Sequence, residues 1–272
     1  MRSLILLFTV SFILCSCKKK NDETPAATCT PLNINVFSLQ RDIDLGAQVA
    51  AEIANDPSTY PVLDESTYST AYTHIRRITT KILNSGNVKH KSDFVWQVKI
   101  IRDDNTLNAF CTPGGYIYVY TGLIKYLDAE DDLAGVLGHE IAHADNRHTT
   151  ETMTREYGIG TLLQIVLGND PGTLVIIAKN LSDLKYSRCH EAEADDYSVR
   201  YLSGTNYRCN GAASFFQKIQ ANGGSSTPEF LSTHPDPGNR VQNINIQAQS
   251  NGCNTSSPAP DAQYSEFKAS LP

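Results

Sequence analysis

The stretch that decides the fold of this chain is DDLAGVLGHEIAHA, which runs from Asp131 to Ala144. Its apolar residues recur at helical spacing, so it predicts a buried helix. Positions four apart lie on one face of an α-helix, and the imidazoles of His139 and His143 can therefore reach one metal ion together. Glu140 lies one step round the helix, where a carboxylate can take a proton from water at the metal rather than bind the metal itself. The H-E-x-x-H pattern thus predicts a catalytic metal site in the middle of a helix.

The residues before this stretch indicate where the helix begins. Asp128 is the expected N-cap, and three acidic residues, Glu130, Asp131 and Asp132, follow it. Negative side chains in the first turn are stabilised by the positive end of the helix dipole. Such a start places both histidines well inside the helix.

The composition is that of a globular protein without a basic surface. The chain has 272 residues, of which 40% are hydrophobic and 19% are charged, enough for one large domain or two small ones. The formal net charge is −6, and the sequence has neither a glycine-rich phosphate loop nor an interleaved basic and aromatic run. Nucleic acid is therefore not an expected partner.

Residues 1–16 have the features of a bacterial lipoprotein signal peptide. A charged start precedes an apolar run from Leu4 to Leu14, which is too short to span a bilayer permanently. The sequence LCSC at residues 14–17 resembles the lipobox and predicts cleavage before Cys17 and acylation of its thiol. Residues 17–36 are expected to form a flexible tether, because they lack a periodic apolar pattern. The alternative is an ordinary secretory signal peptide with incidental cysteines.

An odd number of cysteines remains after the lipobox, so at least one should be free or paired outside the chain. The remaining cysteines are Cys29, Cys111, Cys189, Cys209 and Cys253. Cys209 and Cys253 flank the same C-terminal segment, and we expect them to form a disulfide, because export makes disulfides possible. The rest of the connectivity cannot be read from the sequence.

Two helices and a strand are expected before the metal helix. The first helix begins after Ser38, a cap residue, and ends near Asn55, and the second runs from about Ser66 to Leu83. The segment Phe94–Ile101 alternates in polarity and is rich in β-branched and aromatic residues, which predicts a strand.

A hairpin follows this strand. Its arms are Asn108–Cys111 and Tyr116–Tyr120, and they are joined through Pro113-Gly114-Gly115. Proline and paired glycines are tolerated at the edge of a sheet but not in a central strand. We therefore expect the hairpin to expose a sheet edge just before the metal helix, and an exposed edge can pair with an extended peptide.

Beyond the metal helix the chain is expected to remain helical until its C-terminal tail. An apolar stretch from Ile159 to Ala178 is interrupted at Gly168–Gly172, so two short buried helices are expected there instead of a membrane span. Residues 249–272 are expected to be a loosely ordered tail, since they include three prolines.

Two histidines leave a catalytic zinc one protein ligand short, because such sites usually have three side-chain ligands and keep a position for water. The candidates for the third ligand are His148, His190, Glu191, Glu193 and His234. His148 is five residues beyond His143 and would point to another side of the same helix, so packing or solvent contact is expected for it. The remaining candidates stay open on this reasoning.

Several short motifs point to a family. They are Asn108-Ala109-Phe110, Pro113-Gly114-Gly115, Thr121-Gly122-Leu123, the His139 to His143 pattern followed by Arg147-His148, Ser187-Arg188 with Glu191 and Ala194-Asp195, and His234-Pro235 with Arg240. From about Phe37 to Val241, the chain resembles the HtpX-like and CAAX-prenyl-protease-like zinc metallopeptidases, which carry these motifs in the same order. It resembles most the soluble, periplasmic BepA-like branch, since the transmembrane helices of membrane-embedded members are missing, and so is a following tetratricopeptide array. Cys111-Thr112 departs from the small or apolar residues usual before Pro-Gly-Gly, and this departure is expected to alter substrate preference or redox sensitivity.

The resemblance implies a role for each matching residue. Glu191 becomes the third ligand of one zinc ion per chain, and Asp195 becomes a carboxylate that orients a ligand histidine. The two are four residues apart and share a helix face, as a ligand and its supporter should. His234 or Arg240 would donate to the oxyanion of the reaction, with pairing of Arg240 to an acidic residue as the alternative. Glu193 is rotated away from Glu191 and is expected to be a solvated charge.

The resemblance also implies a fold and a way to hold substrate. Residues 37–248 are expected to form an α+β structure, a mostly helical zincin-type metalloprotease domain with a small antiparallel sheet whose edge strand borders the active-site cleft. Gly114, Gly115 and Tyr116 would then align the substrate backbone in extended form, which favours unfolded or flexible polypeptides.

Together these features predict a membrane-anchored zinc-dependent endopeptidase that cleaves unfolded or misassembled envelope proteins. Its cofactor would be Zn²⁺, its partners polypeptide substrates, and its location the bacterial cell envelope, at the outer membrane facing the periplasm or at the cell surface. The main alternative is a zinc-binding chaperone or assembly adaptor with little proteolysis. A small-molecule zinc hydrolase is less favoured because a peptide-pairing edge is expected. A structural zinc site is less favoured because such sites usually close with four Cys or His ligands.

Overall fold

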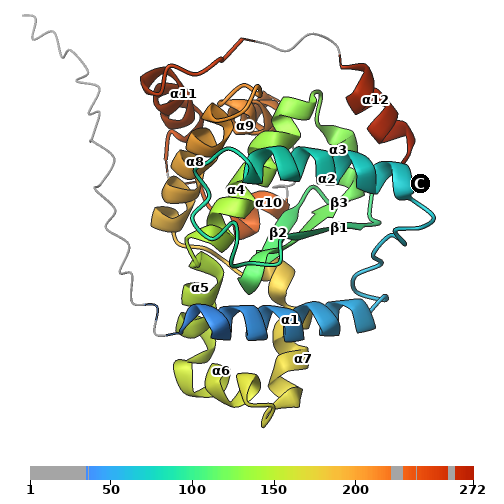
Figure 1. Cartoon of the computed structure of the whole chain (residues 1–272), viewed down its shortest axis with the longest axis vertical. Coiled ribbons are helices and arrows are strands. Elements are labelled where there is room, and N and C mark those ends of the chain that lie inside the picture. Colours follow the sequence, from blue (N-terminus) through green and yellow to red (C-terminus); the bar gives the residue numbers. More distant parts are fainter. Residues whose placement is uncertain (1–34, 36, 222–228, 237, 257–260) are drawn as a thin grey trace, which may run out of the picture.

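A computed structural model describes residue 35 and residues 37–221, 229–236, 238–256 and 261–272 of the chain (Figure 1). The predicted signal peptide, Cys17 and nearly all of the predicted tether lie outside the described residues.

The described residues form a mostly helical structure with one small sheet, which confirms the predicted α+β class. The expected helices after Ser38 and before Leu83 are present, and so is the strand that ends at Ile101. The elements are α1 (Leu39–Asn55), α2 (Ser69–Leu83), β1 (Gln97–Ile101), β2 (Ala109–Thr112), the 3₁₀ turn η1 (Pro113–Gly115), β3 (Tyr116–Tyr120), α3 (Thr121–Tyr126), α4 (Glu130–Asp145), α5 (His148–Tyr157), α6 (Ile159–Val166), α7 (Pro171–Lys179), the 3₁₀ turn η2 (Leu181–Asp183), α8 (Arg188–Ser203), α9 (Gly211–Ala221), α10 (Glu229–Thr233), α11 (Arg240–Ser250) and α12 (Ala262–Ala269).

The sheet differs from the prediction in strand direction and order. Its order is β1-β3-β2, and β3 pairs parallel with β1 and antiparallel with β2, so the sheet is mixed rather than antiparallel. Tyr116–Tyr120 is the central strand, and the expectation that it forms an exposed edge is wrong. The turn at Pro113–Gly115 explains the difference, because it removes the proline and both glycines from the strand and leaves β3 free to pair on both sides.

Helix α4 forms the centre of the structure, where it packs against α8, α9, α2 and β2 (Figure 1). Every residue of this helix except Asp131 is buried. A Cβ added at Gly135 would lie 2.1 Å from the backbone nitrogen of Ala212, and one at Gly138 would lie 2.8 Å from the Ser198 hydroxyl oxygen. The two glycines therefore let α9 and α8 approach α4 closely, which buries the helix on all sides.

The start of α4 also differs in detail from the prediction. Ala129, not Asp128, is the N-cap residue, and its N–H donates to the Asp132 carboxylate at 3.1 Å. Asp132 also pairs with Arg208, so this carboxylate closes the first turn and holds it to the segment before α9. Asp128 pairs instead with Lys218, at 2.6 Å.

The two short helices predicted between Ile159 and Ala178 are present as α6 and α7, with a bend of 109° between them. Within the described residues, no helix by itself has the length and apolar composition to cross a membrane, whereas this bent pair passes both criteria together. The expectation that both helices are buried is wrong in part, because Leu167 at their connection is 65% exposed and Ile176 is 54% exposed.

Part of the segment predicted as a loose tail is helical, because α12 lies within residues 261–272. Tyr264 and Phe267 of α12 are buried in the main core, and the Tyr264 hydroxyl donates to the Ile124 carbonyl at 2.7 Å. Two aromatic side chains inserted among distant residues fix this helix, although its composition suggests a tail. The predicted disulfide between Cys209 and Cys253 is confirmed, and it ties this end of the chain to the segment before α9.

Candidate active site

Helices α4 and α8 bring the predicted metal ligands together at the centre of the structure. His139 and His143 come from α4 and Glu191 from the first turn of α8, whose N-cap Ser187 accepts a hydrogen bond from the His190 N–H. Their ligand atoms lie within 4.8 Å of one another and of a ring nitrogen of His234. All four side chains are buried.

The distances between these atoms suit a zinc ion. His139 Nε2 lies 3.0 Å from His143 Nε2 and 3.3 Å from Glu191 Oε2, and His143 Nε2 lies 3.4 Å from Glu191 Oε1. A tetrahedral zinc with bonds of about 2.0–2.1 Å separates its donor atoms by about 3.3 Å. Two imidazoles and a carboxylate in this arrangement therefore fit a catalytic zinc centre and leave a further position open.

His234 lies beside these three ligands and beside Glu140. Its Nδ1 is 3.1 Å from Glu191 Oε1 and 3.4 Å from His139 Nε2, and its Nε2 is 3.6 Å from Glu140 Oε1. Phe230 stacks on the His234 ring with 4.1 Å between centroids and so fixes its orientation. The structure therefore adds a third imidazole to the two on α4.

Glu140 is buried beside the cluster and has unused hydrogen-bonding capacity. Within the part of the chain that the structure describes, neither of its carboxylate oxygens accepts a hydrogen bond. Burial raises the pKa of this carboxyl group above its usual value, which makes the carboxylate a stronger base. Such a group is suited to accept a proton from a molecule that enters the site.

Asp195 and Arg240 form hydrogen bonds and ion pairs with the side chains of the cluster. Asp195 Oδ1 is 2.9 Å from His139 Nδ1, as expected for a carboxylate that orients a ligand ring. Arg240 donates to both oxygens of Asp195, at 2.7 and 2.8 Å, and one of its terminal nitrogens lies 2.9 Å from Glu191 Oε2. The structure thus agrees with the alternative in which Arg240 pairs with acidic residues. Because its guanidinium is held in this way, His234 is the better placed donor toward a substrate.

These contacts also set the charge of the site before a metal binds. Burial and Arg240 lower the pKa of His139, but hydrogen bonds with Asp195 and Glu191 outweigh both and raise it to about 9. Burial would raise the pKa of Glu191, but electrostatic interactions with His234 and Arg240 and hydrogen bonds with the α4 histidines hold it well below its usual value. Glu191 is therefore ionised, as a metal ligand must be, and His139 would release a proton when a metal binds.

Tyr186 is a neighbour of the site that the sequence did not single out. Its ring stacks on His143 with 3.8 Å between centroids, and its hydroxyl lies 3.0 Å from the Thr149 hydroxyl and 3.7 Å from Cys111 Sγ. Burial lowers the pKa of His143 well below its usual value and keeps its ring neutral. Cys111 is a free thiol whose pKa is raised by burial, so it is poorly suited to redox chemistry. The position of Tyr186 directly before the Ser187-Arg188 motif was the available signal.

The other candidate ligands lie outside the cluster. His148 is not on the metal helix, because α4 ends at Asp145, Arg147 takes a left-handed conformation with φ of 62°, and a new helix begins. Its ring packs beside His143, 3.1 Å between Nδ1 atoms, and stacks on His190. Glu193 lies 3.4 Å from His148 Nε2, so it is a partner of that ring rather than a freely solvated charge.

The residues predicted to bind substrate are in the interior. Gly114 has a φ of 76°, lies against α1, and its carbonyl already accepts the Val95 N–H at 3.1 Å. A Cβ at Gly115 would lie 3.1 Å from the Trp96 ring. Tyr116 is buried within the central strand, so these three residues do not form an exposed edge.

Comparisons with known proteins agree with this geometry. Residues 69–248 match the model of peptidase family M48. The chain is 32% identical over 148 residues to the mitochondrial metalloendopeptidase OMA1 of Arabidopsis thaliana. The matched region covers 54% of this chain and 30% of that protein. It is 27% identical over 223 residues to a putative beta-barrel assembly-enhancing protease of Vibrio cholerae, covering 71% and 46%. It is 24% identical over 250 residues to the metalloprotease YcaL of Escherichia coli, covering 89% and 94%. The chain therefore spans less than half of the first two relatives and nearly all of the third.

Proposed function

This chain belongs to peptidase family M48, whose members depend on zinc, and from that premise we propose that it is a membrane-anchored zinc endopeptidase. Its substrates would be unfolded or misassembled proteins of the bacterial cell envelope. The observation that carries the proposal is the buried cluster of His139, His143 and Glu191. Beside it lies Glu140, whose carboxylate accepts no hydrogen bond from any described residue.

Each side chain of the site has its own role in peptide hydrolysis. Zinc bound by His139, His143 and Glu191 would supply a Lewis acid that makes water a nucleophile at neutral pH. Glu140 takes the proton of that water and returns it to the leaving amine. His234 Nε2, which has no hydrogen-bond partner among the described residues, donates to the oxygen of the attacked carbonyl. Arg240 holds Asp195, and Asp195 holds the His139 ring in the orientation that the metal needs.

The N-terminal sequence and the names of relatives support a place in the cell envelope. Relatives in Vibrio cholerae, Yersinia pestis and Escherichia coli are named beta-barrel assembly-enhancing proteases. In our proposal residues 1–16 direct export, Cys17 carries the lipid, residues 17–36 are the tether, and residues 37–248 are the peptidase domain. The anchor would hold the domain at the outer membrane, facing the periplasm.

Burial of the site favours unfolded substrates. His139, Glu140, His143, Glu191 and His234 are each at most 1% exposed, so the reacting groups cannot be reached by the surface of a folded protein. An unfolded segment presents its backbone for binding in extended form, whereas the backbone of a folded protein is already paired.

A matched pair of substrates tests this. One disulfide-stabilised protein is offered to the zinc-loaded enzyme in its native form and again after reduction and alkylation, and fragments are followed over time. We expect cleavage of the unfolded form only, and no cleavage of either form by the Glu140→Gln variant. Equal cleavage of native and unfolded forms by the wild type would contradict the proposed substrate class.

Burial of the site is also compatible with the second function, which is that of a zinc-binding chaperone or assembly adaptor. Both functions need the ligands, but only the peptidase needs Glu140. In cells that lack the wild-type gene, a Glu140→Gln copy should fail to restore the wild-type phenotype. Full restoration by that copy would favour the adaptor.

A further inference from the structure

Helices α6 and α7 and their connection form an apolar hairpin, residues 158–179, which we call the α6–α7 hairpin. From Gly158 to Ala178 the only charged side chain is Asp170, and it is used to cap α7 by accepting the Thr173 N–H at 3.1 Å. A segment of this composition is unusual on the surface of a soluble domain, where exposed helix faces normally carry charges.

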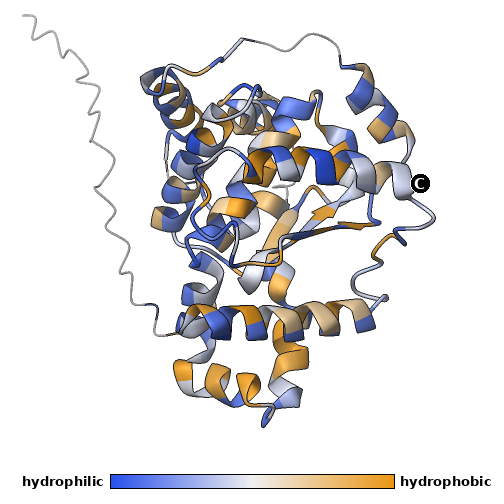
Figure 2. Cartoon of the chain, in the orientation of Figure 1, coloured by the Kyte–Doolittle hydropathy of each residue, from blue (hydrophilic) through white to orange (hydrophobic). Residues whose placement is uncertain are grey.

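The exposed apolar side chains of the described residues gather on this hairpin. The large hydrophobic residues that are exposed are Val95, Ile159, Leu167, Val175, Ile176 and Ile246, and the middle four belong to the hairpin. Figure 2 shows both helices as strongly hydrophobic at the lower end of the molecule. Exposed apolar side chains that gather on one segment are typical of an interaction site.

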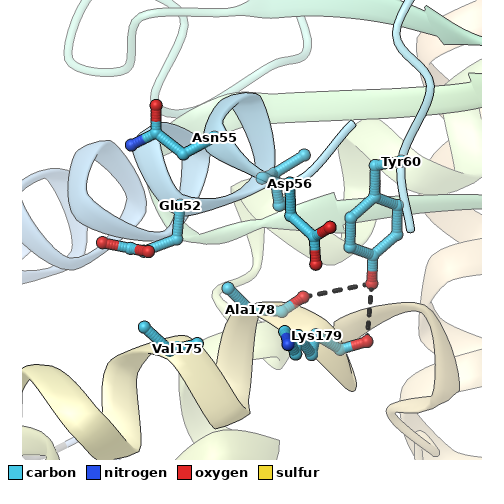
Figure 3. Close-up of a pocket in the computed structure, with 8 residues that line it drawn as sticks. Glu52, Asn55, Asp56, Tyr60, Val175, Ala178 and Lys179 are labelled. Atoms are coloured by element: carbon cyan, nitrogen blue, oxygen red, sulfur yellow. Dashed lines mark hydrogen bonds between the residues drawn. The ribbon is translucent and has the colours of Figure 1, made fainter. Parts of the chain in front are cut away.

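The base of the hairpin is fixed to the domain while its tip projects from it. The Tyr60 hydroxyl lies 3.0 Å from both the Ala178 and the Lys179 carbonyl oxygens at the end of α7 (Figure 3). A pocket of about 270 Å³ lies between α7 and α1 beside this contact, and none of its lining residues belongs to the metal cluster. Leu162, Ile165 and Ile177 are buried against the domain, whereas Ile159, Leu167 and Ile176 are at least 40% exposed in the part of the chain that the structure describes.

We propose that the α6–α7 hairpin inserts its outer apolar side chains into the surface of the phospholipid bilayer that carries the protein, an inference that rests on the proposed anchoring through Cys17. The length of the tether indicates that the bilayer is what covers the exposed side chains of the hairpin. A flexible chain of about 20 residues spans about 25 Å on average, and residues 17–36 end where α1 begins. Helix α1 packs against both α6 and α7, so the anchor enters the domain beside the hairpin. The exposed apolar side chains of the hairpin can therefore reach the bilayer.

Insertion would give the domain a fixed orientation on the membrane. Interfacial segments bury their apolar face about 5–10 Å into the boundary between headgroups and acyl chains. The lipid at Cys17 and the hairpin would form two contacts, and stable attachment generally needs two. The cluster on α4 and α8 would then be held above the membrane surface instead of turning freely on its tether.

Tryptophan fluorescence in proteoliposomes tests this inference. The full-length acylated protein, in the Glu140→Gln background to prevent self-cleavage, is reconstituted in vesicles of phosphatidylethanolamine and phosphatidylglycerol, with or without lipids brominated near the top of the acyl chains. Leu167→Trp and Ile176→Trp report on the hairpin. Ile246→Trp on α11 is the matched control, since Ile246 is 49% exposed. The native Trp96 is the common background.

We expect brominated lipids to quench the hairpin tryptophans severalfold more strongly than the control. Equal quenching at all positions, or none, in protein that mass spectrometry and vesicle flotation show to be acylated and bound would overturn the inference and leave the anchor intact. Protein that is neither acylated nor bound to vesicles would overturn the anchor as well. A blue shift of Leu167→Trp that appears without vesicles and grows with protein concentration would instead assign the hairpin to a second copy of the chain.

Discussion

Replacing Glu140 with Gln is expected to lower kcat for peptide cleavage about 100- to 10,000-fold, the usual contribution of a general base. The amide has the shape of the carboxylate but cannot accept the proton of the attacking water. No described residue uses either oxygen of Glu140 as an acceptor, so the substitution breaks no hydrogen bond that holds the fold. The variant should therefore fold normally and retain its metal.

Zinc content and kcat are measured on the same preparations. Glu156→Gln on α5 is the matched control, since Glu156 is exposed and pairs with Arg155 only at 3.7 Å, and it should keep wild-type zinc content and kcat. A Glu140→Gln protein that binds zinc and cleaves at the wild-type rate would refute the assigned role. Loss of zinc together with activity would make Glu140 part of the metal site instead.

Replacing Arg240 with Met is expected to lower the free energy of unfolding by about 3–5 kcal/mol, the cost of removing one partner from a buried ion pair. Arg240 is 2% exposed and donates to both oxygens of Asp195 while lying against Glu191. Methionine fills much of the volume but leaves two buried carboxylates with fewer donors. The His139 ring, which depends on Asp195, should lose its fixed orientation as well.

Denaturant unfolding of the chelated proteins measures this cost without the stabilising effect of metal binding. Arg200→Met on α8 is the matched control, because Arg200 pairs with Asp196 at 2.5 Å but is half exposed. Exposed pairs contribute about 0–1 kcal/mol, so this substitution should change stability little. Equal losses in the two variants would show that the Arg240 network is not a buried ionic support.

The local features of the site could be predicted from the sequence because they follow from helix geometry and short motifs. The two histidines of α4 and the Ser38 cap required only helical spacing and capping preferences. The family, the peptidase class and zinc as the cofactor followed from the order of the motifs and are confirmed by the family match and the donor cluster. The role of Glu191 as a ligand stays a prediction, although the structure brings it to the right place.

The features that could not be predicted depend on contacts between distant parts of the chain. Strand order in the sheet is decided by what packs on β3, and Pro113–Gly115 suggested an edge only because the turn that removes these residues from the strand was not foreseen. The helix break at Arg147 depends on one residue in a left-handed conformation, and helix periodicity gives no sign of it. Burial of Tyr264 in α12 depends on a core formed elsewhere in the chain.

The most direct test of a catalytic zinc held by His139, His143 and Glu191 is digestion of an unfolded protein before chelation, after chelation, and after zinc is restored. Zinc content is measured at each stage. We predict about one zinc per chain, loss of digestion when it is removed, and recovery when it is returned. Digestion that continues unchanged in the chelated, zinc-free protein would contradict the zinc mechanism.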